Sequence, residues 1–426
     1  MPDRPFLVEG SLARVVGHEL SVRGLRLRLG DPLMVAGTDG ERLAEVVAIH
    51  PDGATALVYG DTAGLGRGDR VRRLDHTPGA LVGAALLGRV IDALGRPMDG
   101  GPPIVGQAVR LDIEPPQAMA RRRIDSPIET GVRLIDTLCT VGKGQRVGIF
   151  GGSGVGKSTL LGMLARGNRS DVSVVGLIGE RGREVREFIE DELGPEGLAR
   201  SVVVVATSDQ PALLRLRAAR YATRIAEWFA DNGGDVVLMM DSITRLAMAQ
   251  REIGLAAGEP PTSRGYTPSV FSLLPRILER SGPRRTGTIT GLYTVLVDGD
   301  DMNDPIADAV RGILDGHLVL DRRLAHLGRY PAIDPLASLS RLASKVTNPQ
   351  QQRVANAVRE ALAAAAEVQE LVEVGAYVPG SNPRADRGLK VTPQLVEFLK
   401  QRPGDLTGFE LGWQALTDIC TRGELL

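Results

Sequence analysis

The sequence predicts an α/β domain that lies between a small β domain and a helical domain, and three observations lead to this fold class. From about residue 76 to 345, short apolar runs alternate with long helical patterns, as in a largely parallel sheet covered by helices. Before residue 75 strand-like runs are joined by turns, and beyond residue 346 the helical period returns without strands. Because 426 residues exceed what one hydrophobic core usually holds, we expect domains at 1–75, 76–345 and 346–426.

The first domain is expected to be a small β-barrel or sandwich. Leu25–Leu29 alternates strictly between leucine and arginine, which predicts a strand, and Glu45–Ile49 predicts another. Asp39-Gly40 and Asp52-Gly53 are typical of tight turns between strands. We expect the arginines of the first strand to face solvent rather than a ligand.

The central domain contains three continuously apolar runs, which is typical of parallel strands covered on both faces. They predict strands at Val172–Ile178, Ser201–Ala206 and Val236–Met240. The pattern over Asp209–Asn232 has the period of a long helix. Strands and helices therefore alternate along this part of the chain.

The tail is expected to be helical throughout. Asn348 followed by Pro349 predicts a helix start, because Asn caps a helix and Pro fits its first turn. Thr407 with Glu410 fits a capping box that opens a last helix toward Cys420. The helix predicted to start at Pro349 has one apolar face, which is made of Val354, Val358, Leu362, Ala365, Val368 and Leu371.

The composition excludes several classes of function. With 51 basic and 52 acidic residues, no overall charge favours nucleic acid or an anionic membrane. Cys139 and Cys420 are far apart and outside any metal-ligand spacing, which predicts a reducing compartment without a disulfide. Met1–Gly10 lacks the apolar segment of a secretory signal, and no apolar run approaches the roughly 20 residues of a spanning helix. We expect a soluble, cytoplasmic protein that does not act on nucleic acid.

The most informative motif is Gly151–Ser158, which reads GGSGVGKS and fits the phosphate-binding pattern G-x-x-x-x-G-K-[ST]. It follows a strand predicted at Arg146–Phe150 and precedes a helix predicted at Thr159–Arg166, which a chance glycine-rich turn would not require. Glycines let backbone N–H groups face phosphate oxygens, Lys157 reaches the β and γ phosphates, and the Ser158 hydroxyl holds Mg²⁺. The residues expected to bind a nucleoside triphosphate are Gly151, Gly152, Ser153, Gly154, Val155, Gly156, Lys157, Ser158 and Thr159.

Two carboxylates follow predicted strands. Asp241 comes directly after Val236–Met240, where Mg²⁺ at a phosphate loop is held from its second side. Glu180 follows Val172–Ile178, and a glutamate at that edge can orient and polarise an attacking water. Each has a plainer interpretation, because strands often end in Asp at turns and a glutamate after a strand is commonly a surface or capping group.

The order and spacing of these pieces resemble one family over nearly the whole chain. This family is the flagellar and type III secretion export ATPases, which are relatives of the catalytic β subunit of rotary ATP synthase. As a set the matching stretches are highly specific. They are Thr140–Arg146, the phosphate loop, Leu177–Phe188, Asp241–Arg245, Met248–Glu252, Gly258–Pro261, Gly299–Met302, Pro305–Asp308, Ile313–His317 and Tyr330–Asp334.

The resemblance implies a RecA-like P-loop ATPase domain between an N-terminal β-barrel and a C-terminal helical domain. It also implies that the chain forms a ring of six identical subunits that hydrolyses ATP. By the same resemblance, Lys157 and Ser158 bind phosphate and Mg²⁺, Asp241 supports the metal and Glu180 activates water.

Five further residues are implied by the resemblance. Ser338-Leu339-Ser340-Arg341 resembles the segment that presents an arginine finger to the γ-phosphate of a neighbouring subunit, with an ordinary surface ion pair of Arg341 as the alternative. Arg181 and Arg245 resemble secondary positioning residues, with ordinary ion pairs as the alternative. Tyr330 resembles the aromatic residue that packs on adenine, and Tyr377 is a second candidate for this role. For both tyrosines, an ordinary place in the core is the alternative.

The resemblance also implies partners. A central stalk protein would lie near Glu259–Pro268 and Asp300–Asp304, with ordinary loops rich in Gly, Pro and Asp as the alternative. Export chaperones and protein substrates would meet the helical domain. A stator-like regulator and peripheral contact with the membrane export gate are implied as well. Family members commonly carry an N-terminal helical extension for the regulator, whereas here Val8-Glu9-Gly10 leads almost directly into the first strands.

Within the family, Arg264–Phe271 and Asp308–Gly312 look more flagellar than injectisome-like. An injectisome ATPase therefore stays open as the alternative. A noncatalytic ring subunit, a ring-shaped nucleic-acid translocase and the synthase catalytic subunit itself are further alternatives. The presence of Glu180 argues against the noncatalytic subunit.

Overall fold

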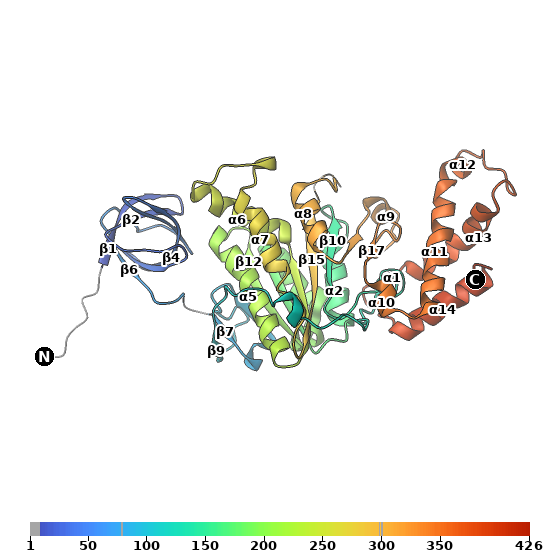
Figure 1. Ribbon diagram of the computed structural model, residues 1–426, viewed down its shortest axis with the longest axis horizontal. Coiled ribbons are helices and arrows are strands. Elements are labelled where there is room, and N and C mark those ends of the chain that lie inside the picture. The colour runs from blue at the N-terminus through green and yellow to red at the C-terminus, as the bar shows by residue number, and fades with distance from the viewer. Residues whose placement is uncertain (1–8, 78–79, 298, 300) are drawn as a thin grey trace.

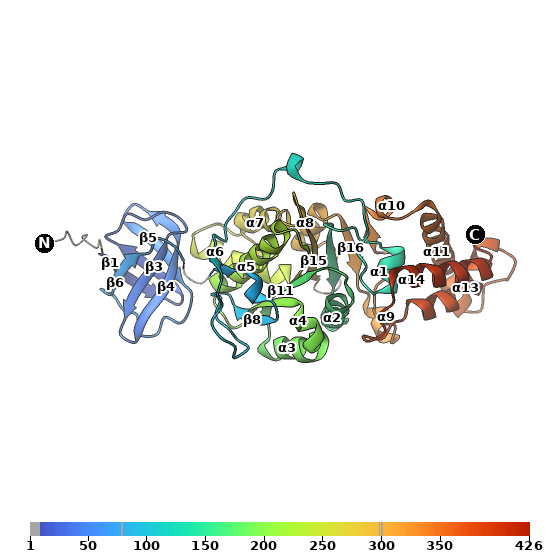
Figure 2. The same cartoon turned by 90° about the horizontal axis from the view of Figure 1, so that it is seen from below.

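The computed structural model describes residues 9–77, 80–297, 299 and 301–426. A closed barrel, a large sheet with helices on both faces and a group of helices follow one another along the long axis (Figure 1 and Figure 2). The predicted fold class is therefore confirmed. The prediction about Met1–Gly10 falls mostly outside the described residues, and so does the Asp300 part of the predicted stalk-facing loop.

The barrel closes six described strands in the order β1-β2-β5-β4-β3-β6. They are β1 Glu9–Val16, β2 Glu19–Arg23, β3 Pro32–Gly37, β4 Gly40–His50, β5 Gly53–Val58 and β6 Arg70–Arg73. Leu20, Leu33 and Val71 are fully buried inside it. Glu45–Ile49 lies within β4, and the two predicted turns join β3 to β4 and β4 to β5, so these predictions are confirmed.

The strand predicted at Leu25–Leu29 is wrong. This segment is an irregular connection between β2 and β3, flanked by Gly24 and Gly30, which both have positive φ. Leu25 still packs against the barrel core, whereas Leu29 is 68% exposed. The alternation of leucine and arginine therefore reflects a loop that tucks in some of its leucines, because positive-φ glycines interrupt extended pairing at both ends.

The central sheet has the strand order β17-β16-β10-β15-β13-β11-β12-β8, with β14 paired to β15. The strands from β16 to β8 are parallel neighbours, and β17 is antiparallel at the edge. The sheet strands are β8 Arg89–Asp92, β10 Arg146–Gly151, β11 Val172–Glu180, β12 Ser201–Thr207, β13 Asp235–Asp241, β14 Gly282–Pro283, β15 Thr288–Leu296, β16 Gly316–Val319 and β17 Leu339–Ser340. The three predicted central strands and the predicted strand before the phosphate loop are confirmed.

Helices and short elements surround this sheet. A separate pair of short strands is formed by β7 Leu81–Val82 and β9 Gln107–Ala108. The helical elements are η1 Ala84–Leu86, η2 Ala118–Ala120, α1 Arg133–Leu138, α2 Lys157–Gly167, α3 Gly182–Glu187, η3 Phe188–Leu193, α4 Gly194–Ala199, α5 Ala212–Asp231, α6 Ile243–Ala256, η4 Ser263–Gly265, α7 Pro268–Leu278, α8 Pro305–Ile313, α9 Arg322–His326 and α10 Ala343–Val346. The helix predicted over Asp209–Asn232 is α5, and the one predicted after the phosphate loop is α2.

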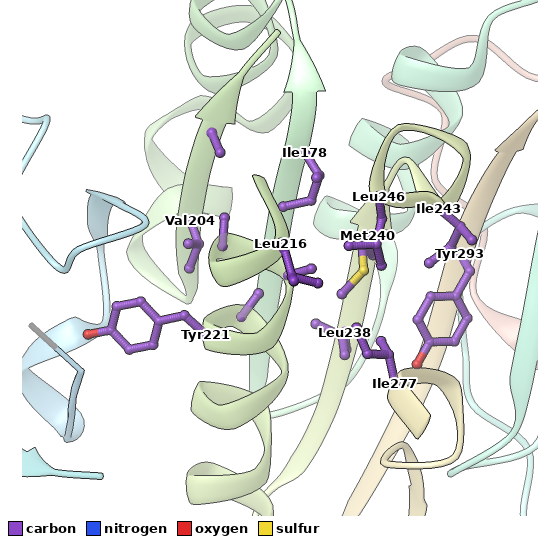
Figure 3. Close-up of a cluster of buried hydrophobic side chains, with 14 of the residues drawn as sticks. Ile178, Val204, Leu216, Tyr221, Leu238, Met240, Ile243, Leu246, Ile277 and Tyr293 are labelled. Atoms are coloured by element: carbon purple, nitrogen blue, oxygen red, sulfur yellow. The ribbon is translucent and has the colours of Figure 1, made fainter. Parts of the chain in front are cut away.

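Both faces of the sheet are buried, which explains the continuously apolar strands. On one face Leu238 and Met240 of β13 pack against side chains of α5 and α6, including Leu216 and Leu246 (Figure 3). The alternate residues of the same strand, such as Val237, belong to a second core that includes α2. Because consecutive strand residues point to opposite faces, a strand covered on both sides has no polar period.

The tail contains α11 Pro349–Glu367, α12 Gln369–Glu373, α13 Pro383–Leu399 and α14 Phe409–Arg422. Asn348 caps α11 in a capping box with Gln351, so the predicted start is confirmed. Val354 and Val358 are buried, but the apolar face ends earlier than predicted. The helix breaks at Val368, and Leu371 in α12 is 48% exposed.

The capping box predicted at Thr407 is also wrong, although the last helix exists. α14 begins at Phe409 with Gly408 as its cap, and no side chain caps it. The backbone N–H of Thr407 instead donates to Gly131 O at 3.1 Å, which holds this residue against the central domain. Among the described helices, none combines the length and apolar content that a bilayer-spanning segment needs.

Candidate functional site

The phosphate loop runs from the end of β10 to the start of α2. Gly154 and Gly156 have φ of 78° and 90°, a left-handed conformation that side chains rarely adopt, and Gly156 caps the helix. Val155 between them is buried and anchors the loop to the core. The loop therefore presents backbone N–H groups and the positive end of the α2 dipole to solvent, as an anion-binding site requires.

The polar side chains of the loop differ in their partners. Lys157 Nζ donates to Gly151 O at 2.9 Å and to Gly152 O at 2.6 Å, so the ammonium group lies over the loop. Ser158 is exposed. Thr159, which was expected to bind nucleotide, donates its hydroxyl to Glu192 Oε1 at 2.8 Å and thereby ties the start of α2 to η3.

The predicted carboxylates lie at the carboxyl ends of the parallel strands, where the phosphate loop begins. β10, β13 and β11 are parallel and end at Gly151, Asp241 and Glu180, so all three ends point the same way. Asp241 is only 6% exposed, and Thr294 on β15 donates a hydrogen bond to it. Glu180 is half-buried. Parallel strand ends thus collect residues from distant parts of the sequence at one edge.

The electrostatics of this edge favour a cation. Burial raises the pKa of Glu180 to about 8, and the charge of Asp241 adds to the increase. Burial also raises the pKa of Asp241, against the opposing effects of the Thr294 hydrogen bond and the Lys157 charge. Ionisation of each carboxylate is therefore less favourable than in water, and a nearby hard cation would favour the ionised form.

Mg²⁺ fits this set of donors. Within the described residues, no group of three or more His, Cys, Asp or Glu side chains forms a self-sufficient metal site. Magnesium at a phosphate loop takes only one or two protein oxygens and completes its shell with phosphates and water. The hydroxyl of Ser158 and the carboxylate of Asp241 are the two oxygens that the sequence predicts for this purpose, and the charge of Lys157 lowers the pKa of Asp241.

Arg245 on α6 belongs to the same cluster. Its charge lowers the pKa of both Glu180 and Asp241, and its aliphatic stem packs beside Gly179, where an added Cβ would lie 2.8 Å from Arg245 Cβ. Among the described residues its buried Nε has no hydrogen-bond partner. Gly179 is thus the residue that allows the arginine to approach the end of β11.

Glu184 is a third carboxylate of the site, and the sequence interpretation missed it. A side-chain hydrogen bond between Glu184 and Glu180 contributes to the raised pKa of Glu180. Arg181 Nη1 lies 3.3 Å from Glu184 Oε1, but its side chain is 74% exposed. The sequence did hold a signal for Glu184, which lies four residues after Glu180 in the first turn of α3. The first side chains of a helix that follows a strand can point back toward the end of that strand. Thr294 was missed too, since a threonine inside an apolar strand gives no signal.

The structure separates the two candidate tyrosines. Tyr330 lies beside the phosphate loop, because a Cβ added to Gly156 would lie 3.4 Å from the Tyr330 ring. Tyr330 is 43% exposed, which is consistent with a ring open to a planar base. Tyr377 instead belongs to the connection between α12 and α13 and donates its hydroxyl to Asp386 at 2.9 Å. This connection lies at the outer end of the helical part (Figure 1). The structure therefore does not bring Tyr377 to the loop, because its hairpin points away from the sheet.

Arg341 lies at the amino ends of the parallel strands, whereas the phosphate loop lies at their carboxyl ends. Its backbone N–H donates to Asp315 O, and the N–H of Asp315 donates to Arg146 O at the start of β10. The loop begins at Gly151, five residues further along that strand, which is a distance of about 17 Å at about 3.3 Å per residue. The exposed guanidinium of Arg341 has no hydrogen-bond or ion-pair partner within the described part of the chain. It cannot serve the phosphate loop of its own subunit.

Comparison with known proteins agrees with this architecture. The chain matches three family models: the nucleotide-binding domain of the ATP synthase alpha/beta family over residues 131–340, the beta-barrel domain of that family over 14–75, and the T3SS EscN ATPase C-terminal domain over 347–418. The last of these models distinguishes the chain from a synthase subunit.

Individual relatives span almost the whole chain. A flagellum-specific ATP synthase of Bacillus subtilis is 51% identical, with 96% of this chain and 94% of the relative covered. A type 3 secretion system ATPase of Xanthomonas euvesicatoria is 50% identical, with 96% and 93% covered. The structure of the assembled ATPase EscN with its central stalk EscO, from enteropathogenic E. coli, has a TM-score of 0.87 at 43% identity and covers 96% of this chain and 99% of EscN. The chain thus belongs to the flagellum-specific and type III secretion ATPases of the ATP synthase alpha/beta family.

Proposed function

We propose that this chain hydrolyses Mg-ATP and thereby energises type III protein export, in the first place flagellar export. The observation that carries the proposal is the convergence of the phosphate loop, Asp241 and Glu180 at one edge of the sheet. Hydrolysis of a terminal phosphate requires positioning and charge more than covalent chemistry, and these groups supply both.

Each side chain has a role in this proposal. Lys157 exchanges its loop carbonyl partners for the β and γ phosphates of ATP. Ser158 and Asp241 hold Mg²⁺, which when bound neutralises phosphate charge. Glu180 accepts a hydrogen bond from the attacking water and orients it toward the γ-phosphate. Arg245, whose charge favours the ionised form of Glu180, keeps this carboxylate ready to accept the proton.

The test of this role is Glu180→Gln. We expect ATP binding, measured with a fluorescent analogue, to persist while turnover falls by about 10²-fold or more, because glutamine cannot accept the proton. Glu187→Gln is the matched control: Glu187 lies on α3, is exposed and pairs only with Arg183 at 2.6 Å among the described residues. Hydrolysis by the Glu180 variant at the parental rate would remove Glu180 from the mechanism.

The proposed assembly is a ring of six identical subunits in which Arg341 completes the site of its neighbour. The support is that Arg341 is exposed and lies about 17 Å from its own phosphate loop along β10. Activity should rise steeply with protein concentration as rings form. A mixture of Arg341→Ala and Lys157→Ala subunits should recover turnover, and a monomer with concentration-independent turnover would contradict the shared site.

The proposed partners are a central stalk protein, a stator-like regulator, export chaperones and their protein cargo. The two loops assigned to the stalk form one surface, because Arg264 pairs with Asp301 at 2.8 Å and with Asp304 at 3.1 Å. The similar ATPase EscN has been solved in complex with its central stalk EscO, which supports the proposal that this protein also binds a central stalk. We propose a cytoplasmic location, in peripheral contact with the export apparatus of the inner membrane, and the support is the similarity to an ATPase named for a type 3 secretion system.

An injectisome ATPase is the second candidate, and the observation in its favour is the 50% identity to the Xanthomonas type 3 secretion system ATPase. Complementation separates the two pathways. Expression in a flagellar-ATPase null strain should restore motility if the chain is flagellar. Restoration of effector secretion in an injectisome-ATPase null strain, without motility in the first strain, would favour the second candidate.

A further inference from the structure

Arg359 on α11 reaches out of the helical part of the chain and binds the segment that carries Arg341. Its Nη1 donates to Pro335 O at 2.6 Å, and both Nη1 and Nη2 lie 3.4 Å from Ser338 O. Within the described residues no carboxylate lies within ion-pair distance of Arg359. The charged guanidinium of Arg359 therefore binds backbone carbonyls three and six residues before Arg341. Hydrogen bonds from a charged donor are stronger than those between neutral groups.

The second nitrogen of the same guanidinium binds the end of α1. Nη2 donates to Leu138 O at 2.7 Å and lies 3.4 Å from Cys139 Sγ. The rigid fork of arginine therefore joins α11, the end of α1 and the 335–338 segment, which a flexible lysine ammonium could not do in the same geometry. Burial raises the pKa of the Cys139 thiol to about 11, so this neighbour is neutral.

The backbone that leads to Arg341 is otherwise held by short polar contacts. Ser338 Oγ accepts from Val319 N at 2.9 Å, and Ser340 Oγ donates to Thr140 O at 2.7 Å. Ser338 and Ser340 are both buried. The guanidinium of Arg341 therefore extends into solvent from a fixed base, and Arg359 is the part of this base that comes from the helical domain.

We propose that Arg359 is a positioning residue for Arg341: it fixes where Arg341 meets the active site of the neighbouring subunit, and it makes that position depend on how α11 sits against the central domain. This inference rests on the proposed role of Arg341 in the neighbouring site. Movement of the helical domain, for example when a chaperone or cargo binds it, then changes hydrolysis at the neighbouring active site through residues 335–341.

The test compares Arg359→Met, which keeps the apolar stem, with Arg359→Lys, which keeps the charge and loses the fork. We expect kcat of Arg359→Met to fall about 10- to 100-fold, because a displacement of about 1 Å can cost about 10²-fold. Arg359→Lys should fall less. The affinity for a fluorescent ATP analogue should stay parental, since the phosphate loop of the same subunit is untouched. Arg353→Met, exposed on the same helix, is the matched control.

Mixed rings give the decisive readout. Arg359→Met subunits have an intact phosphate loop and a misplaced arginine, whereas Lys157→Ala subunits have the reverse. A one-to-one mixture should recover on the order of a quarter of parental turnover, as expected for random head-to-tail assembly. Arg341→Ala with Lys157→Ala calibrates this value. If Arg359→Met does not assemble, Arg359→Lys is mixed in its place.

The outcomes are distinguishable. Recovery in both mixtures, with no further loss when Arg359→Met is added to Arg341→Ala, supports the inference. Recovery in the Arg341 mixture alone overturns it, because Arg359 then acts within its own subunit, and so does a loss of nucleotide affinity that matches the loss of kcat. Failure of the Arg341 mixture overturns both the shared site and the inference.

Discussion

Replacing Glu184 by glutamine should move the pH dependence of ATP hydrolysis toward lower pH. Burial, the charge of Asp241 and the hydrogen bond with Glu184 together raise the pKa of Glu180 to about 8. Water activation requires the ionised carboxylate, so kcat/KM is expected to rise with pH through this pKa. At pH 7 about one-tenth of the free enzyme would carry an ionised Glu180, and at pH 8 about half.

Glu184→Gln removes a like charge and a carboxyl hydrogen-bond partner from Glu180, and both of these raise its pKa. The pKa of Glu180 must therefore fall, because its ionised form becomes less unfavourable. A decrease of one unit would take the ionised fraction at pH 7 from about one-tenth to about one-half, a rise of about fivefold. The prediction concerns the position of the rising limb and not the height of the plateau.

The assay is kcat/KM from phosphate release between about pH 6 and 9.5 at saturating Mg²⁺, for the parent, Glu184→Gln and the control Glu187→Gln. The parent and the control should share one limb, and Glu184→Gln should lie to the acidic side. A limb that does not move, or that moves toward higher pH, would show that Glu184 does not act on the base. A parental limb near the ordinary glutamate pKa would refute the assignment of Glu180.

The remaining predictions concern base binding and stability. Tyr330→Ser should raise KM for ATP with little change in kcat, because the ring beside the loop is lost, while Tyr377→Ser should change neither; steady-state kinetics with equal effects would contradict this. Arg280→Met should lower the free energy of unfolding by about 3 kcal/mol, since the fully buried Glu227 loses its bidentate partner and retains only longer contacts, with Arg224 at 3.3 Å and Arg284 at 3.8 Å; urea titration should show recovery when Glu227→Gln is added. Gly388→Ala would place a Cβ 2.4 Å from a carbonyl oxygen of α11 and should cost about 1–3 kcal/mol; an unchanged thermal transition would show that α11 and α13 separate freely.

Local patterns predicted the elements well where one physical cause dominates. The strand before the phosphate loop and the start of α11 follow from an apolar run and from a cap, and both are as predicted. The failures lie where another part of the chain decides. Leu25–Leu29 reads as a strand but is a loop, and Thr407 reads as a cap but is bound to Gly131 of the central domain. A one-dimensional pattern carries no information about these competing partners.

The sequence by itself determined the phosphate loop and the two carboxylates that follow apolar strands, because backbone freedom at glycine and the chemistry of Lys, Ser, Asp and Glu are properties of the residues. Only the tertiary structure decided which groups share a site. Parallel strand ends gather Glu180, Asp241 and the loop at one edge, and a helix turn adds Glu184. Arg341 follows β17, the antiparallel outermost strand. Because β17 runs opposite to the other strands, its last residue lies at their amino ends, away from the phosphate loop.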